Sequence, residues 1–224
     1  MDAIIRAVLA CTAAALAWML PDLAFAFASY KQKKRGLEVP RQCPSVRWRM
    51  VSTAVCLAYE GAAMWYMPQT LAVLSILFVY AAIFGSCVDM MIRIIANEML
   101  LALLPVGIGY RVLAGGIGSL KGSLGGLMLV LAVFASAAAV TRLIKGIGGV
   151  GMGDIKLAMV AAVTAGWPGS LYFLGGMALA IGAFCLIGVK SFLLRRNSTF
   201  PMCGHIMAGL LIALIYPYIQ GVMT

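Results

Sequence analysis

Long apolar stretches follow one another along the chain, with only short polar or glycine-rich interruptions between them. A helix needs about 20 apolar residues to cross a bilayer, and about 17 are enough for an upright one. The pattern therefore predicts an all-α, polytopic membrane protein with about eight transmembrane helices. The predicted spans are 3–29, 50–66, 70–88, 99–113, 122–141, 155–167, 170–189 and 201–220. Since the interruptions leave no room for a soluble domain, we expect residues 1–224 to form a single membrane-embedded domain.

Composition and charge agree with a membrane protein and predict its orientation. Hydrophobic residues make up 63% of the chain and charged residues 11%, against about 25% charged in soluble domains. Seven of the 17 basic residues fall in the loop 31–49. With this loop in the cytoplasm, 14 basic residues face the cytoplasm and three the other side, as the positive-inside rule requires. The net charge of +10 is thus explained by the lipid bilayer, and no nucleic-acid partner is expected.

Two short segments predict tight reversals between neighbouring helices. Met67-Pro68-Gln69 and Trp167-Pro168-Gly169-Ser170 are both too short for a domain and contain turn-forming residues. Glycines recur in the later spans, where they let helix backbones approach each other closely. The glycines with this expected role are Gly115, Gly116, Gly118, Gly122, Gly125, Gly126, Gly175, Gly176 and Gly182.

The acidic residues are few enough to weigh one by one. Placing an ionisable side chain in a span costs at least ~2.5 kcal/mol, so such a residue is a candidate functional residue. Asp89 ends the third predicted span and Asp154 begins the sixth, which puts both at the cytoplasmic edge. Two carboxylates that approach each other share one proton and so provide an acid and a base for activating water. The pair therefore predicts an aspartic catalytic dyad.

Other uses of these acids remain open from the residues alone. Asp154 could simply cap a helix, and either aspartate could pair with Arg93 or Lys156. A metal pair is disfavoured, because hard cations require more oxygen ligands than two carboxylates supply. In a small transporter or channel component, Asp22, Glu60 and Asp89 would line an ion path. That alternative predicts acids at midplane depth and repeated halves, and the chain shows no internal repeat.

Two further polar residues have simpler expected roles. Asp22 follows Pro21, and we expect it to satisfy backbone groups freed by the proline or to pair across helices. His205 is the only histidine, and a zinc site needs three or four ligands. We therefore expect His205 to be packed or hydrogen-bonded.

The context of the two aspartates resembles a known family. Gly151-Met152-Gly153-Asp154-Ile155-Lys156 resembles the G-x-G-D-x-K signature of the prepilin peptidases, membrane aspartic proteases that process type IV pilins and type II secretion pseudopilins. Residues 89–97 resemble the family's first catalytic segment, D-x-x-x-x-x-I-P-N, with Asp89 and Asn97 on matching positions. Ala96 replaces the usual proline, which should loosen a turn. More loosely, residues 200–205 are similar to the family's P-F-G-P-F-L segment, and Glu60 is similar in position to an acid before the second reversal.

The resemblance implies both a site and a substrate. Asp89 and Asp154 would be catalytic, and Gly151, Gly153, Lys156 and Asn97 would support the motifs, with no metal and no cofactor. The substrate would be a prepilin or pseudopilin precursor, cut after a glycine at the cytoplasmic face of the bacterial inner membrane. A presenilin-like enzyme shares G-x-G-D but usually carries tyrosine before its other aspartate, where this chain has Val88.

A second activity of the family is not expected here. Many prepilin peptidases also N-methylate the new N-terminus and carry a long cytoplasmic domain with paired C-x-x-C motifs. In this chain the loop is short, and Cys43-Pro44-Ser45-Val46 resembles a relic of the first motif with valine in place of the second cysteine. The resemblance therefore implies a short form without zinc, and argues against N-methyltransferase activity.

Overall fold

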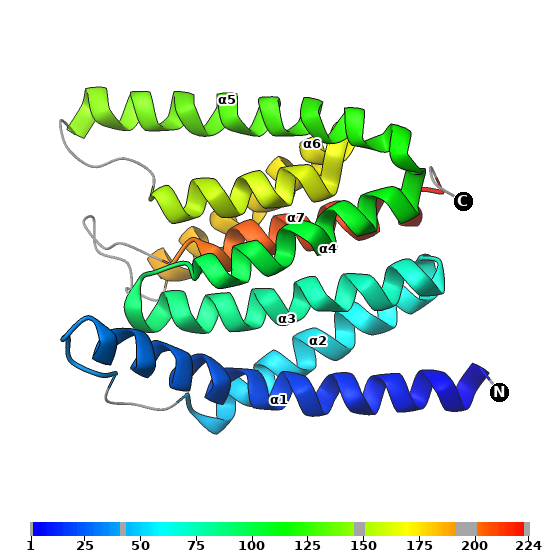
Figure 1. Ribbon diagram of the computed structural model, residues 1–224, viewed down its shortest axis with the longest axis horizontal. Helices are drawn as coiled ribbons and strands as arrows, with labels where there is room; N and C mark the ends of the chain where they lie inside the picture. The colour runs from blue at the N-terminus through cyan, green and yellow to red at the C-terminus, as the bar shows by residue number, and fades with distance from the viewer. Residues whose placement is uncertain (1, 41–43, 146–150, 191–200, 222–224) are drawn as a thin grey trace. The chain divides into compact units, whose positions relative to one another are not determined.

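Every secondary-structure element in the described part of the chain is helical (Figure 1). The computed structural model describes residues 2–40, 44–145, 151–190 and 201–221. In chain order, the elements are α1 (Asp2–Lys34), α2 (Val46–Tyr66), α3 (Gln69–Ile92), α4 (Asn97–Gly115), the short 3-10 helix η1 (Ile117–Ser119), α5 (Leu120–Lys145), α6 (Met152–Lys190) and α7 (Cys203–Ile219). The predicted all-α class is therefore confirmed.

Five of the described helices are long and apolar enough to cross a membrane. They cover Ala7–Lys34, Gln69–Ile92, Asn97–Gly115, Ile117–Leu143 and Met152–Ile187. α7 is apolar but shorter, and α2, which contains Arg47, Arg49 and Glu60, is less apolar than these five. The chain is thus a multi-pass membrane protein.

The predicted number of spans differs from the number of helices because of α6. Two predicted spans, 155–167 and 170–189, lie within this one helix. Gly166 (φ 61°, ψ −179°) and Trp167 (φ −84°, ψ 138°) are not helical and divide α6 at the predicted reversal. In Figure 1 the two ends of α6 lie on the same side of the view and the kink lies on the other. The seven α-helices of the described residues therefore give eight helical segments, because the kink divides α6 into two.

The helices form two compact units, residues 1–94 and 95–224. Because several helical units can belong to one membrane domain, the single domain expected from the sequence stays a prediction. In the first unit, α1, α2 and α3 each pack against the other two. The face of α1 that is buried in this unit consists largely of small residues, whose short side chains allow close helix approach: Ala13, Ala17, Ala24 and Ala28.

The two ends of α2 are defined by an ion pair to α1 and by a tight reversal into α3. Arg49, in its first turn, forms an ion pair with Asp22 of α1, with 2.7 Å between Nη2 and Oδ1. The predicted pairing of Asp22 across helices is therefore confirmed. At the other end, α2 stops at Tyr66 and α3 begins at Gln69, which confirms the predicted tight reversal.

In the second unit, α6 packs against α4, α5 and α7. Glycines make several of these contacts possible. A Cβ at Gly209 of α7 would lie 2.6 Å from the Phe173 carbonyl oxygen of α6, and one at Gly176 would lie 3.1 Å from Ile212 Cβ. A Cβ at Gly126 of α5 would collide with Ser170 Oγ. The predicted packing role is therefore confirmed for Gly126 and Gly176.

Gly122 of α5 also packs closely, since a Cβ there would lie 3.2 Å from the Trp167 carbonyl oxygen of α6. Four other predicted glycines have no such role. Gly116, Gly118, Gly175 and Gly182 have open space where a Cβ would stand. Of these, Gly116 instead ends α4 with a positive φ of 70°, a conformation that glycine adopts without steric cost.

Candidate active site

Asp89 lies in the last turn of α3 and is only 6% exposed. The backbone N–H of Arg93 donates to the Asp89 carbonyl oxygen at 3.0 Å. Arg93 has a φ of 55°, a left-handed conformation that commonly ends helices. The carboxylate of Asp89 is therefore attached to a regular helix just before that helix stops.

Asp154 lies in the first turn of α6, and Gly151 provides the space for its side chain. A Cβ at position 151 would stand 2.7 Å from Asp154 Oδ2. Real Cβ atoms essentially never approach a neighbour this closely, so any other residue at 151 would displace the carboxylate. The backbone N–H of Ile155 donates to the Gly151 carbonyl oxygen at 3.2 Å, which starts the helix around the acid. The carboxylate therefore sits at the positive end of the helix dipole.

Gly153 has a different role, which is close packing. A Cβ at this position would lie 3.2 Å from Ile95 Cβ, just before the start of α4. The two glycines of the G-x-G-D signature thus serve separate purposes. Gly151 makes room for the acid, and Gly153 lets the start of α6 approach the segment that leads into α4.

Ala96 stands where the family pattern has proline, and its backbone remains compatible with proline. Its φ is −67° and its ψ is 120°. A proline ring fixes φ at about −65°, so alanine here keeps the angle that proline would impose. Ala96 is buried, and its carbonyl oxygen accepts from Leu100 N–H at 3.2 Å at the start of α4. The turn is therefore regular in spite of the substitution that was expected to loosen it.

Asn97 and Lys156 line the same groove in the second unit. The groove has a volume of about 410 Å³. The other lining residues are apolar and come from α4, α5 and α6: Leu100, Leu101, Leu104, Leu127, Met159, Val160 and Val163. On α4 and α6 they recur at the helical spacing of three or four residues, a signal that is visible in the sequence. Asn97 is the first residue of α4 and Lys156 the fifth of α6, so the groove is polar near the starts of these helices and apolar beyond them.

The second unit therefore brings together most of the predicted site residues. Gly151, Gly153, Asp154 and Lys156 surround the start of α6, and Asn97 faces the groove with Lys156. Asp89 belongs to the first unit. The dyad of Asp89 with Asp154 stays a prediction.

Glu60 is a further acid inside the first unit. Glu60 is 3% exposed, and its Oε2 has no hydrogen-bond partner among the described residues. It lines a cavity with Leu57, Gly61, Met64, Trp65 and Ala10, all from α1 and α2. The position predicted from the family resemblance is therefore a buried one.

His205 is packed and hydrogen-bonded, as expected from the sequence. Its Nδ1 donates to the Pro201 carbonyl oxygen at 3.0 Å, and its ring contacts Phe184 edge-on at 5.0 Å between centroids. Two predicted features extend beyond the described residues. Cys43 of the suspected relic motif and Phe200 of the last family segment lie outside them.

Comparison with known proteins bears on the identity of this site. The sequence model of the type IV leader peptidase family matches residues 76–189, just over half of the chain. This match covers both aspartates and all four motif-supporting residues. Neither a search of curated proteins nor a search of solved structures found a match. The chain belongs to the type IV leader peptidase family, and is a peptidase built on membrane-spanning helices.

Proposed function

We propose that this protein is an aspartic endopeptidase that cleaves the cytoplasmic leader from type IV prepilins or type II secretion pseudopilins. Asp89 and Asp154 would form the catalytic dyad at the cytoplasmic face of the bacterial inner membrane. The observation that carries the proposal is the space reserved for the Asp154 carboxylate by Gly151, within a region that matches the peptidase family.

The proposed chemistry needs only the two carboxylates and water. One ionised aspartate takes a proton from a water molecule, whose oxygen attacks the scissile carbonyl carbon. The other aspartate, protonated, donates its proton to the carbonyl oxygen. As the C–N bond breaks, the first aspartate returns its proton to the amide nitrogen, and the second recovers one from the tetrahedral intermediate. No acyl-enzyme forms, because water is the nucleophile.

The chain connection supports joint action of the two aspartates. Asp89 precedes Ile95 by only six residues, and Ile95 packs against Gly153, the neighbour of Asp154. The same connection contains the buried, proline-like Ala96. A short link between the two motifs, buried at Ile95 and Ala96, favours a shared site, since reacting groups must be held within a fraction of an ångström.

The groove that Asn97 and Lys156 line supports a substrate with an apolar segment. We propose that this segment of the precursor lies along the leucines and valines of α4 and α6, with its cleavage point near Asn97 and Lys156. The amide of Asn97 and the ammonium of Lys156 can hydrogen-bond the polar main chain near the cut. This arrangement matches a precursor with a basic leader in the cytoplasm and an apolar helix in the membrane.

The test is co-expression of the full chain with candidate precursors, followed by mass measurement of the products. We expect the wild-type chain to remove the leader from at least one pilin-like precursor. Asp154→Asn and Asp89→Asn should each abolish cleavage while the protein still inserts into the membrane. Substantial residual cleavage by Asp154→Asn would rule out the dyad.

A matched control separates catalysis from folding. Glu98→Gln changes the other carboxylate of the second unit, in the first turn of α4, and is outside the proposed machinery. This variant should cleave normally. Loss of cleavage by Glu98→Gln to the same extent as by Asp154→Asn would show that the assay reports general damage.

A further inference from the structure

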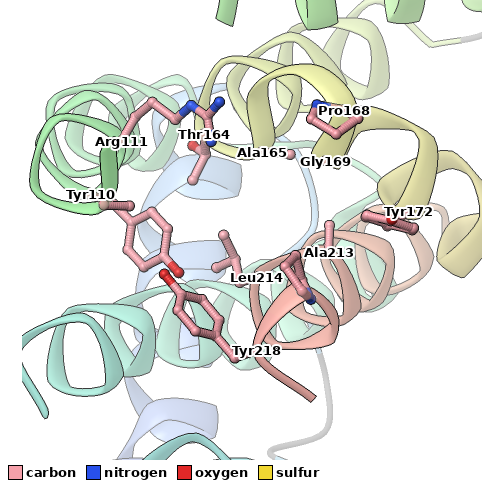
Figure 2. Close-up of a pocket in the computed structure, with 12 residues that line it drawn as sticks. Tyr110, Arg111, Thr164, Ala165, Pro168, Gly169, Tyr172, Ala213, Leu214 and Tyr218 are labelled. Atoms are coloured by element: carbon pink, nitrogen blue, oxygen red, sulfur yellow. The ribbon is translucent and has the colours of Figure 1, made fainter. Parts of the chain in front are cut away.

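A second cavity lies at the end of the second unit that is remote from Asp154. Its volume is about 130 Å³, which corresponds to roughly four water molecules at the ~30 Å³ each occupies in the liquid. Figure 2 shows that polar side chains reach it from three helices: Tyr110 and Arg111 of α4, Thr164 and Tyr172 of α6, and Tyr218 of α7. The hydroxyl ends of Tyr110 and Tyr218 point toward one another (Figure 2).

Arg111 is held in this cavity by the kink of α6. Its Nη2 donates to the Trp167 carbonyl oxygen at 3.2 Å. A Cβ at Gly166 would lie 2.5 Å from both Cζ and Nε of Arg111, so the guanidinium lies directly against the glycine. Gly166 also has a φ of 61°, which a side chain would disfavour. The kink therefore creates both the shape and the position of this cationic site.

The guanidinium has more donors than the protein uses. Arginine carries five N–H donors and no acceptor. Arg111 Nε is buried and has no hydrogen-bond partner among the described residues. The lining of the cavity contains no carboxylate, so the positive charge has no counter-ion there.

The carboxylates of the second unit lie too far from Arg111 to act as its counter-ion. Its only acidic residues are Glu98 and Asp154. Glu98 precedes Arg111 by 13 residues in α4, and Asp154 precedes Trp167 by 13 residues in α6. At a rise of about 1.5 Å per residue, each is roughly 20 Å away along the helix axis. A cation in a membrane protein without a nearby anion is costly, and an anionic ligand would stabilise it.

We infer that this cavity is a phosphate-binding site, in which Arg111 binds the phosphate and a tyrosine hydroxyl donates a further hydrogen bond. Arginine suits phosphate because its planar donors can engage two oxygens at once. The site lies about one turn before the end of α4, where the long side chain of an arginine can reach the membrane interface. The phosphate can come from a phospholipid headgroup or from free inorganic phosphate.

The test uses the full chain, purified in a maltoside detergent, which contains no phosphate. Inorganic phosphate is titrated at constant ionic strength while thermal unfolding is followed. A second titration uses short-chain phosphatidylglycerol, with diacylglycerol of the same chain length as its phosphate-free reference. Saturable stabilisation by either phosphate source supports the site. A response to phosphatidylglycerol alone identifies the headgroup, and a response to both identifies a site open to free phosphate.

The variants isolate the cavity from the general charge of the surface. Arg111→Gln should weaken phosphate binding at least tenfold. Lys121→Gln is the matched control, because it removes one positive charge from an exposed residue at the start of α5 that does not line the cavity. It should change the affinity less than twofold. Ala114→Leu keeps Arg111 and fills the cavity from α4, so it should also weaken binding at least tenfold even if Arg111→Gln does not fold.

Three outcomes would contradict the phosphate-binding site. No saturable stabilisation of the wild-type chain by either phosphate source would overturn it. Equal binding by wild type and Ala114→Leu, or equal losses in Arg111→Gln and Lys121→Gln, would also overturn it. In those cases Arg111 would only support the kink of α6. None of these results depends on cleavage, so they are distinct from a failure of the proposed peptidase function.

Discussion

At the scale of single residues, the G-x-G-D signature is explained by two different space requirements. Gly151 accommodates the carboxylate of Asp154, and Gly153 accommodates Ile95. Neither requirement involves a positive φ. Sequence alone indicated that these glycines matter, and the structure gives close approach as the reason.

Gly151→Ala tests the role of the first glycine. The added methyl group would stand 2.7 Å from Asp154 Oδ2 and so push the carboxylate from its position. Because misplacement of a reacting group by about 1 Å can cost around 100-fold, we expect kcat to fall by one to two orders of magnitude with little change in thermal stability. The measurement is cleavage of a precursor by purified protein.

The matched control for this prediction is Gly175→Ala. Gly175 is a glycine of the same helix, and nothing lies within 4 Å of its added Cβ. The control should keep wild-type kcat. Normal kcat in Gly151→Ala would contradict the assigned role of the glycine.

Ala96→Pro tests whether the proline of the family pattern fits this chain. The backbone φ of −67° already suits proline. Such a substitution stabilises by about 0.4–1 kcal/mol when the native angle is compatible, because it restricts the unfolded chain. We expect equal or higher thermal stability and normal cleavage. A marked loss of stability would mean that the Ala96 backbone does not have this conformation in the membrane.

At the scale of elements, the contact between α6 and α7 depends on glycine. Gly209 packs against backbone atoms of α6. A Cβ added to it would lie 2.6 Å from the Phe173 carbonyl oxygen and 2.8 Å from the Met177 nitrogen. Displacing backbone atoms costs more free energy than displacing the end of a flexible side chain. Such packing by small residues replaces the hydrophobic driving force that helices lack within lipid.

Gly209→Ala should therefore separate the two helices and lower stability. Overpacking of this kind typically costs about 1–3 kcal/mol. Thermal unfolding in detergent measures the effect, with Gly182→Ala as the control, since nothing lies within 4 Å of its added Cβ. Equal unfolding temperatures for the two variants would contradict the close helix contact.

The groove of α4, α5 and α6 gives a second prediction at this scale. Met159→Trp places a large side chain in the groove beside Lys156. If the apolar segment of the substrate lies there, KM should rise several-fold while the protein stays folded. Leu179→Trp is the control, because Leu179 is 72% exposed and does not line the groove. An unchanged KM in Met159→Trp would exclude the groove as the substrate path.

At the scale of the whole molecule, hydrophobic pattern was enough to predict the helical membrane class. The predicted spans match helices because each is a continuous apolar run, and Pro68 marked the reversal between α2 and α3. The kink of α6 was also predicted at Trp167-Pro168, although its helical continuity was not. Local residue chemistry therefore predicts where helices start, stop and bend.

Contacts between helices could not be predicted in the same way. Three features join residues from distant parts of the chain: the contact of Ile95 with Gly153, the groove with Asn97 and Lys156, and the cavity of Arg111. Sequence patterns specify the face of a helix but not its partner. Motifs therefore indicated Asp154 as functional, while Arg111 had no motif to identify it.

The most direct test of the central claim is whether Asp89 and Asp154 act as one catalytic unit. Cleavage rates of a purified precursor are measured for wild type, Asp89→Asn, Asp154→Asn and the double variant. Residues that act as a unit are not additive, so removing both costs about as much as removing one. We predict a loss of at least 100-fold in each single variant and no further loss in the double variant. Substantial cleavage by either single variant, or losses that multiply in the double variant, would contradict the dyad.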